Sequence, residues 1–252
     1  MLCIDPVKVC SERCNMDFTL QQLFAPVKRV LPRWVANRLR SIATALLGPL
    51  RYAYKSGFVL SSFRMAAVTK TGTPLPWYTY PSIELLRHRD FSDKSVLEFG
   101  GGQSTLWWSG RARRVVTFEG DEAWYRKIKG AMPDNVELHY VSMKSREANV
   151  CMVNDALAAE PDSHFDVIVI DGLCRDAMVD IACRFLARDG VIVCDNAEGY
   201  GICNAFIDRG LRRVDFYGLA PGVVDPHCTS IYFGTSCFVF DPAAPIHAIA
   251  TD

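Results

Sequence analysis

The fold is decided by the segment VLEFGGGQSTL, residues 96–106. Its first four residues are apolar apart from Glu98, which predicts a buried strand, and the glycines after them predict a turn into a helix. These glycines are Gly100, Gly101 and Gly102. A glycine turn lets the backbone approach a ligand where a Cβ atom would clash, and Ser104 or Thr105 is placed to cap the following helix. The segment therefore predicts a site for a nucleotide-like ligand.

Two classes of ligand use such a turn. A dinucleotide site places a pyrophosphate at the helix N-terminus and usually has a third glycine, where this chain has Thr105. Glu98 would crowd a pyrophosphate but suits the ammonium group of a methionine-type ligand. The expected second strand, residues 115–118, is followed by Glu119, about 20 residues after the turn, where a carboxylate accepts hydrogen bonds from ribose hydroxyls. The turn and the two acids favour S-adenosylmethionine over NAD.

Strands and helices alternate after this segment, which predicts a parallel sheet. Five strands are expected at residues 96–99, 115–118, 136–140, 165–170 and 191–194. Two more, residues 213–217 and 230–233, lie too close together for a crossover helix and are expected to be antiparallel. We therefore predict an α/β protein with a Rossmann-like, doubly wound, mostly parallel seven-stranded sheet, a late antiparallel hairpin and an N-terminal helical extension.

Composition limits the choice of partners and compartment. The 252 residues are half apolar, enough for one large α/β domain with an extension. The 28 basic residues balance the 28 acidic ones, so we expect no nucleic-acid partner. The ten cysteines form no CxxC pair, and neither a signal peptide nor a membrane-spanning apolar run is evident. We expect a cytoplasmic protein, either soluble or peripheral to a membrane.

The N-terminal region differs from the rest in its charge. Residues 18–83 contain no acid but nine basic residues, and apolar residues recur at helical spacing from Leu31 to Leu47. We expect one helix that breaks near Gly48-Pro49 and a second from about Leu50. We divide the chain into a basic amphipathic helical extension, residues 1–70, and a cofactor-binding domain, residues 71–252. The extension either packs on the domain or a second subunit, giving a homo-oligomer, or contacts an anionic membrane.

The chain resembles the class I S-adenosylmethionine-dependent methyltransferases over roughly residues 75–235. The matching elements are the turn at residues 98–102, Glu119, the segment 165–172 and Asp189-Gly190. A late hairpin on a parallel sheet is also typical of methyltransferases rather than dehydrogenases. Three further segments look like a poorly characterised bacterial group of small-molecule type: PWYTYP at residues 76–81, Asp171-Gly172 with Arg175, and CTSI at residues 228–231.

The resemblance implies a role for each matching position on the cofactor. Gly100 and Gly102 would face the methionine part, and Glu98 would reach its amino group through the turn or a water molecule. Glu119 would hold the ribose, and Ser142 would lie near the adenine.

The same resemblance places other residues around the transferred methyl group. Asp171 would lie beside the reactive sulfonium, and Thr79 or Tyr80 would close the pocket. All of these positions lie at or near the carboxyl ends of strands, where open α/β sheets bind ligands.

The acceptor must be aligned with the methyl group, and a hydroxyl acceptor must lose its proton. Asp171, Asp195 and Asn196 follow neighbouring strands and resemble the ligands by which catechol and caffeoyl-CoA O-methyltransferases bind a divalent cation such as Mg²⁺. Alternatively, Asp195-Asn196 caps the next turn and Asp171 contacts the cofactor. His227, expected in a loop, is a further candidate base. The aromatic candidates for an acceptor pocket are Trp77, Tyr78, Tyr80 and Tyr200.

The leading hypothesis is therefore a methyltransferase that acts on an oxygen of a small-molecule acceptor. A cofactor-binding regulatory or scaffold protein without transferase activity is the first alternative. An NAD-dependent oxidoreductase is the second, and Thr105 and the late hairpin argue against it.

Overall fold

The computed structural model describes residues 31–142, 144–172, 174–199, 201–241 and 243. The first thirty residues, with Lys28 and Arg29, lie outside this range, as does Tyr200. The chain divides into two compact units, residues 1–52 and residues 53–252. The predicted domain boundary at residue 70 lies inside the second unit, where the Ser61 hydroxyl donates to the Val68 carbonyl at 2.9 Å and accepts from the Val68 N–H at 3.0 Å.

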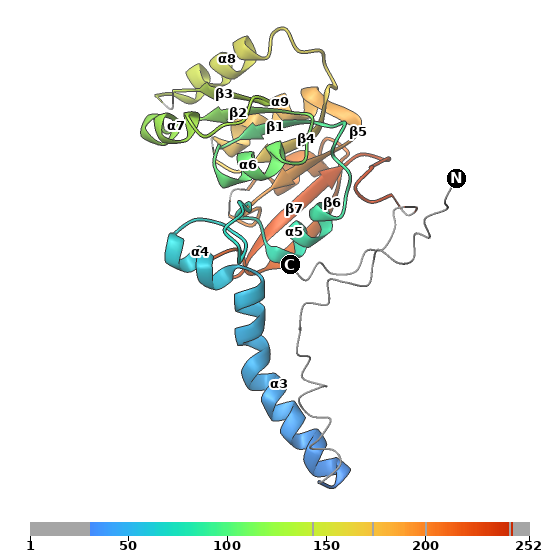
Figure 1. Ribbon diagram of the computed structural model, residues 1–252. Coiled ribbons are helices and arrows are strands. Elements are labelled where there is room, and N and C mark those ends of the chain that lie inside the picture. Colours follow the sequence, from blue (N-terminus) through green and yellow to red (C-terminus); the bar gives the residue numbers. More distant parts are fainter. Residues whose placement is uncertain (1–30, 143, 173, 200, 242, 244–252) are drawn as a thin grey trace, which may run out of the picture. The chain divides into compact units, whose positions relative to one another are not determined.

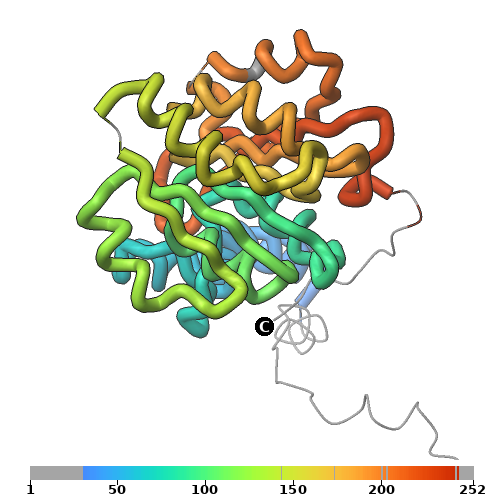
Figure 2. The backbone as a smooth tube through the Cα atoms, turned by 90° about the horizontal axis from the view of Figure 1, so that it is seen from above, coloured from blue at the N-terminus to red at the C-terminus, as the bar shows by residue number. Residues whose placement is uncertain are grey.

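The second unit contains a seven-stranded sheet in the order β3-β2-β1-β4-β5-β7-β6 (Figure 1). Its strands are β1 (Ser95–Phe99), β2 (Arg114–Glu119), β3 (Val136–Tyr140), β4 (Phe165–Ile170), β5 (Leu186–Cys194), β6 (Arg212–Gly218) and β7 (His227–Phe233). The neighbours β1 to β5 pair in parallel, and β7 is antiparallel to both β5 and β6. The predicted fold class is confirmed. In Figure 2, the green segment with β2 and β3 lies on one side and the orange and red segments with β5 to β7 on the other.

Alternate residues of each strand pack on opposite faces of the sheet. In β1, Val96 belongs to one buried apolar cluster, whereas Leu97 and Phe99 belong to the other. The Val96 cluster includes side chains of α5 (Tyr80–Arg87) and α6 (Gln103–Ser109). The Leu97 cluster includes side chains of α8 (Arg146–Ala156), α9 (Val179–Phe185) and α10 (Cys203–Ile207). Helices on both faces bury the central strands completely, which explains their nearly continuous apolar sequences.

Helix boundaries complete the description of the second unit. The remaining described helices of this unit are α4 (Phe58–Arg64), α7 (Glu122–Lys129) and the 3-10 helix η2 (Arg175–Met178). Asp121 caps α7, since its carboxylate accepts from the Trp124 N–H at 2.7 Å. This cap fixes the first turn of α7 beside the end of β2.

The predicted helix break at Gly48-Pro49 is wrong. One continuous helix, α3, runs over Arg33–Lys55 with Pro49 inside it. Proline removes one backbone donor, which kinks or weakens a helix without necessarily ending it, and the leucines around Pro49 are good helix formers. None of the described helices is long and apolar enough to cross a bilayer.

Candidate active site

A cavity of about 740 Å³ lies at the carboxyl ends of β1, β2, β4 and β5. This is the edge at which open parallel sheets bind ligands, and the volume is within the usual range for small-molecule sites. Its lining includes Trp77, Gly100, Gly101, Gly102, Ser104, Glu119, Asp121, Trp124, Asp171, Asp195, Asn196, Val223 and His227. The structure therefore brings together most of the residues singled out from the sequence.

Glu119 stands at the end of β2 and is fixed by two backbone donors. Its Oε2 accepts from the Gly101 N–H at 2.9 Å, and its Oε1 accepts from the Asp121 N–H at 2.7 Å. Each carboxylate oxygen has a second lone pair for a further donor. The side chain lines the cavity and is therefore placed to accept from a pair of neighbouring hydroxyl groups, such as those of a ribose.

A glycine is required at position 100 because the turn after β1 packs closely against the loop after β4, at Asp171 and Gly172. Its φ of +104° is in the region that favours glycine, and a Cβ atom there would lie 2.6 Å from the Asp171 carbonyl oxygen. Gly102 differs, because a Cβ atom at that residue would lie 3.9 Å from its nearest neighbours, which are atoms of Trp124. The turn is thus packed against the end of β4 on one side and open to the cavity at Gly102.

Glu98 lies beneath the turn and is fully buried, so it does not line the cavity. The Gly102 N–H donates to the Thr105 hydroxyl at 2.9 Å, and this hydroxyl donates to Glu98 Oε2 at 2.5 Å. Thr117 of β2 donates to the same oxygen at 3.0 Å. Burial raises the pKa of Glu98 to about 7, against the lowering effect of these hydroxyl donors and Ser104. Glu98 and Thr105 therefore hold the turn in place, whereas Ser104 lines the cavity.

Trp124 is a site residue that the sequence analysis missed. Its indole Nε1 donates to the Gly101 carbonyl at 2.8 Å, and its ring lines the cavity beside the turn. In the sequence it appears only as an apolar residue of a helix. Its position three residues after the Asp121 cap, on the first turn of a helix that follows Glu119, is the signal that could have identified it.

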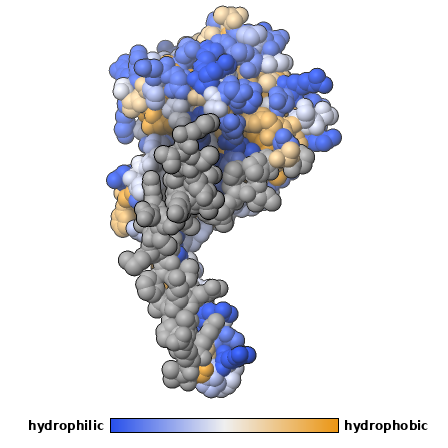
Figure 3. All heavy atoms as spheres, turned by 45° about the vertical axis from the view of Figure 1, so that its right-hand side comes forward, coloured by the Kyte–Doolittle hydropathy of each residue, from blue (hydrophilic) through white to orange (hydrophobic). Residues whose placement is uncertain are grey.

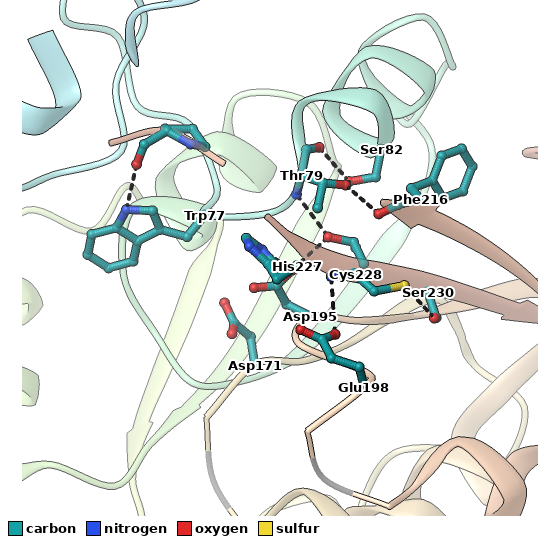
Figure 4. Close-up of polar contacts among 12 residues, drawn as sticks. Trp77, Thr79, Ser82, Asp171, Asp195, Glu198, Phe216, His227, Cys228 and Ser230 are labelled. Atoms are coloured by element: carbon teal, nitrogen blue, oxygen red, sulfur yellow. Dashed lines mark hydrogen bonds and ion pairs between the residues drawn. The ribbon is translucent and has the colours of Figure 1, made fainter. Parts of the chain in front are cut away.

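The other end of the cavity contains Asp195, at the end of β5, and His227, at the start of β7 (Figure 4). The His227 Nε2 and Asp195 Oδ1 atoms are 3.4 Å apart. The Thr229 hydroxyl donates to the same Asp195 oxygen at 2.6 Å. The hydrogen bond to Asp195 raises the pKa of His227, against the opposing effect of burial. His227 was expected in a loop as a candidate base, but it is the first residue of β7 and its side chain is only 9% exposed.

Asp171 and Arg175 lie next to this pair. Arg175, in η2, is buried, and its Nη2 is 3.4 Å from Asp171 Oδ1 while its Nη1 donates to the Asp195 carbonyl oxygen. Burial and the nearby Asp195 carboxylate raise the pKa of Asp171 well above its usual range, although Arg175 lowers it. Two acids, one arginine and one histidine therefore form a single electrostatic cluster at this end of the cavity.

The predicted metal ligands do not fit a divalent cation well. Asp171, Asp195 and Asn196 all line the cavity. However, one Asp195 oxygen faces Thr229 and His227, and Arg175 supplies positive charge beside Asp171. Across the described ranges, no group of three or more histidine, cysteine, aspartate or glutamate side chains is arranged for a metal ion. The reaction proposed below therefore uses no metal ion.

Three further predicted cofactor residues lie outside the cavity lining. Thr79 is buried, and its backbone N–H donates to the Thr229 hydroxyl at 2.9 Å (Figure 4). Tyr80 is also buried and donates its backbone N–H to the Leu219 carbonyl at 2.8 Å. Ser142 follows β3 and accepts from the Asn149 side chain through its carbonyl. Their predicted contacts with the cofactor stay predictions.

Among the described aromatic candidates for the acceptor pocket, only Trp77 lines the cavity, with its indole Nε1 donating to the Pro221 carbonyl at 3.1 Å. Tyr78 is fully buried and accepts a hydrogen bond from Trp108 at 3.2 Å. Sequence alone does not distinguish these neighbours, because an aromatic side chain is suited both to burial in the core and to the wall of a cavity.

Comparisons with known proteins give distant structural similarities only. No protein-family model and no curated protein matches the sequence. The chain is similar to the precorrin-6y C5,15-methyltransferase from Geobacter metallireducens, at 16% identity and a TM-score of 0.46, over 61% of this chain and 87% of that one. It is also similar to a methyltransferase-like protein from Silicibacter pomeroyi, at 18% identity and a TM-score of 0.44, over 64% of this chain and 89% of that one.

A third similar structure is the spermidine synthase from Thermotoga maritima, at 16% identity and a TM-score of 0.43. The similarity extends over 63% of this chain and 59% of the synthase. Likenesses at this level assign no activity to this chain. The function must therefore be argued from the cavity itself.

Proposed function

We propose that the cavity binds S-adenosylmethionine and that the protein transfers its methyl group to a hydroxyl oxygen of a small-molecule acceptor. The single observation that carries the proposal is Glu119. Its carboxylate is fixed by the Gly101 and Asp121 N–H groups at the edge of the cavity, beside an open glycine turn. A carboxylate in that position suits the two hydroxyls of a ribose.

The rest of the cofactor end fits the same ligand. Gly102 leaves the backbone accessible, and the Trp124 ring provides an apolar wall next to Glu119. Ser104 adds a hydroxyl beside the turn. Bound S-adenosylmethionine supplies a methyl group on a cationic sulfonium, and the carboxylates of Glu119, Asp121 and Asp195 that line the cavity suit a cation.

His227 is the residue we assign as the general base. When the acceptor oxygen bonds to the methyl carbon, the bond between that carbon and sulfur breaks, and the hydroxyl proton moves to the imidazole ring of His227. Asp195, 3.4 Å away, stabilises the resulting imidazolium. Asp195 is itself held by the Thr229 hydroxyl and by Arg175, so it orients His227 rather than taking the proton.

The proposal is tested with S-adenosylmethionine that carries a ¹³C methyl group. The full chain is incubated with this cofactor and a mixture of small metabolites, and products are sought by mass spectrometry and NMR. We expect a labelled O-methyl product, and a much lower yield from Glu119→Ala than from the matched control Glu122→Ala, whose side chain is exposed and pairs with Arg126. A labelled N-methyl product would contradict the oxygen assignment, and no labelled product from any acceptor class would contradict methyl transfer.

A further inference from the structure

The helix α3 has two distinct faces. Val35, Leu39, Ile42, Leu46 and Leu50 follow one another at intervals of three or four residues and so share one side of the helix. The opposite side carries mainly polar and basic residues, at intervals of three, four or seven residues: Arg33, Asn37, Arg40, Thr44, Arg51 and Lys55. This arrangement is that of an amphipathic helix.

The apolar face is exposed rather than packed. Leu46 is 66% exposed and Leu50 68% exposed, and Leu39 and Ile42 are exposed as well. In Figure 3, orange apolar and blue polar side chains lie next to each other on the part of α3 that the grey atoms leave visible. A row of exposed apolar side chains on one helix face indicates a partner, because contiguous exposed apolar surface marks interaction sites.

The charge of α3 indicates the kind of partner. The helix contains five basic residues and no acid, and no acid occurs anywhere between residues 18 and 83. A second copy of α3 packed against the first would bring like charges together with no carboxylate on the helix to pair with them. An anionic surface instead complements every charge on the helix.

Trp34 supports the same conclusion. It is 72% exposed and lies between the two faces of the helix. Tryptophan has an apolar ring and a polar N–H group, and it concentrates at the level of lipid headgroups. Arginine side chains beside an apolar face extend their charged ends to the same level while their stems cover apolar surface.

We propose that α3 docks in the plane of a bilayer containing anionic lipids, with its leucine face among the acyl chains and its arginines at the headgroups. Low overall hydrophobicity combined with a basic polar face, a leucine-rich apolar face and a tryptophan between them is typical of helices that lie on a membrane rather than cross it. The proposal is independent of the reaction at the cavity. It would place the catalytic unit beside a membrane.

Co-sedimentation of the full chain with lipid vesicles tests the docking. We expect binding to phosphatidylcholine vesicles that contain phosphatidylglycerol, little binding to phosphatidylcholine alone, and weaker binding at high salt. Each basic residue at the surface contributes about fivefold in affinity, so Arg33→Gln, Arg38→Gln and Arg40→Gln together should weaken binding on the order of 100-fold. Circular dichroism of each variant checks that it is folded.

A matched pair of double variants tests the apolar face. Leu39→Gln with Leu46→Gln places two glutamines on that face and should weaken binding at least about tenfold. Asn37→Gln with Thr44→Gln places two glutamines on the polar face and should leave binding unchanged. The proposal is overturned if the full chain does not bind the anionic vesicles, if it binds neutral vesicles equally well, or if both double variants lose affinity alike. A dimer in light scattering that only Leu39→Gln with Leu46→Gln disrupts, without vesicle binding, would instead identify the face as a self-association surface.

Discussion

The two ends of the cavity are held together by different interactions. At the cofactor end, a single carboxylate, Glu119, is fixed by the backbone N–H groups of Gly101 and Asp121. At the acceptor end, Arg175 pairs with the Asp171 side chain and donates to the Asp195 carbonyl oxygen, and His227 pairs with the Asp195 side chain. Backbone N–H groups do not titrate, whereas the pKa values of Asp171 and His227 are both raised by their surroundings.

This difference separates binding from chemistry. A carboxylate fixed by backbone donors keeps one geometry, which suits a cofactor bound in every turnover. A cluster of coupled acids and bases changes its charge with pH, which suits proton transfer. Substitutions at the two ends should therefore change different measured quantities.

The largest effect is expected at His227. Replacement of a general base lowers the rate by about 100-fold to 10,000-fold, so His227→Gln should lower kcat by at least about 100-fold. The affinity for S-adenosylhomocysteine should stay unchanged, because His227 lies at the other end of the cavity from Glu119. Steady-state kinetics and calorimetry on the same preparation measure both quantities.

The pH profile gives a second result for the same variant. Only neutral His227 accepts a proton, and the pKa of His227 lies above its ordinary value because of Asp195. The kcat of the unmodified chain should therefore rise with pH through this pKa and then level off, and the residual rate of His227→Gln should lack that step. An unchanged profile in the variant would show that another group is the base.

A smaller effect is expected beneath the cofactor turn, at Glu98. Its pKa is about 7 in the folded protein and near 4.5 when exposed, so the folded state binds more protons than the unfolded state between these values. Stability should therefore fall as pH rises from about 4.5 to 7, by about 3 kcal/mol at most. Glu98→Gln removes the titrating group, so urea unfolding at pH 5 and pH 8 should show this loss in the unmodified chain and not in the variant. Equal losses in both proteins would contradict the assignment.

The smallest of the three effects is expected at Glu119. Replacing it by alanine removes hydrogen bonds from two ribose hydroxyls to a charged group, so Glu119→Ala should weaken S-adenosylhomocysteine binding at least about tenfold. Its kcat with saturating cofactor should change much less than that of His227→Gln. Glu122→Ala, at an exposed position three residues away, serves as the control. Equal affinities of the two variants would remove Glu119 from the cofactor site.

The cofactor end could be predicted from the sequence because its signals are local. The strand, the glycine turn and Glu119 lie within 24 consecutive residues, and parallel pairing of Phe99 with Phe118 places both strand ends at one edge. The sequence did not reveal which of these residues line the cavity and which are buried beneath it. Glu98 lies on the α6 side of β1, where Thr105 and Thr117 enclose it, so it holds the turn from below.

The acceptor end could be predicted only in part, because it depends on long-range pairing. The expected strand at residues 230–233 actually begins at His227, and its antiparallel register pairs Ser230 with Cys194. This register brings Thr229 and His227, two residues apart on one side of β7, next to Asp195. No local pattern around His227 specifies that pairing.

The central claim is that the cavity binds S-adenosylmethionine and not a dinucleotide. The most direct test is isothermal titration calorimetry of the full chain with S-adenosylhomocysteine and, separately, with NAD. We expect S-adenosylhomocysteine to bind with one site per chain, and NAD to give no binding heat at the same concentrations. Binding of NAD, or no binding of S-adenosylhomocysteine to the folded chain, would contradict the account.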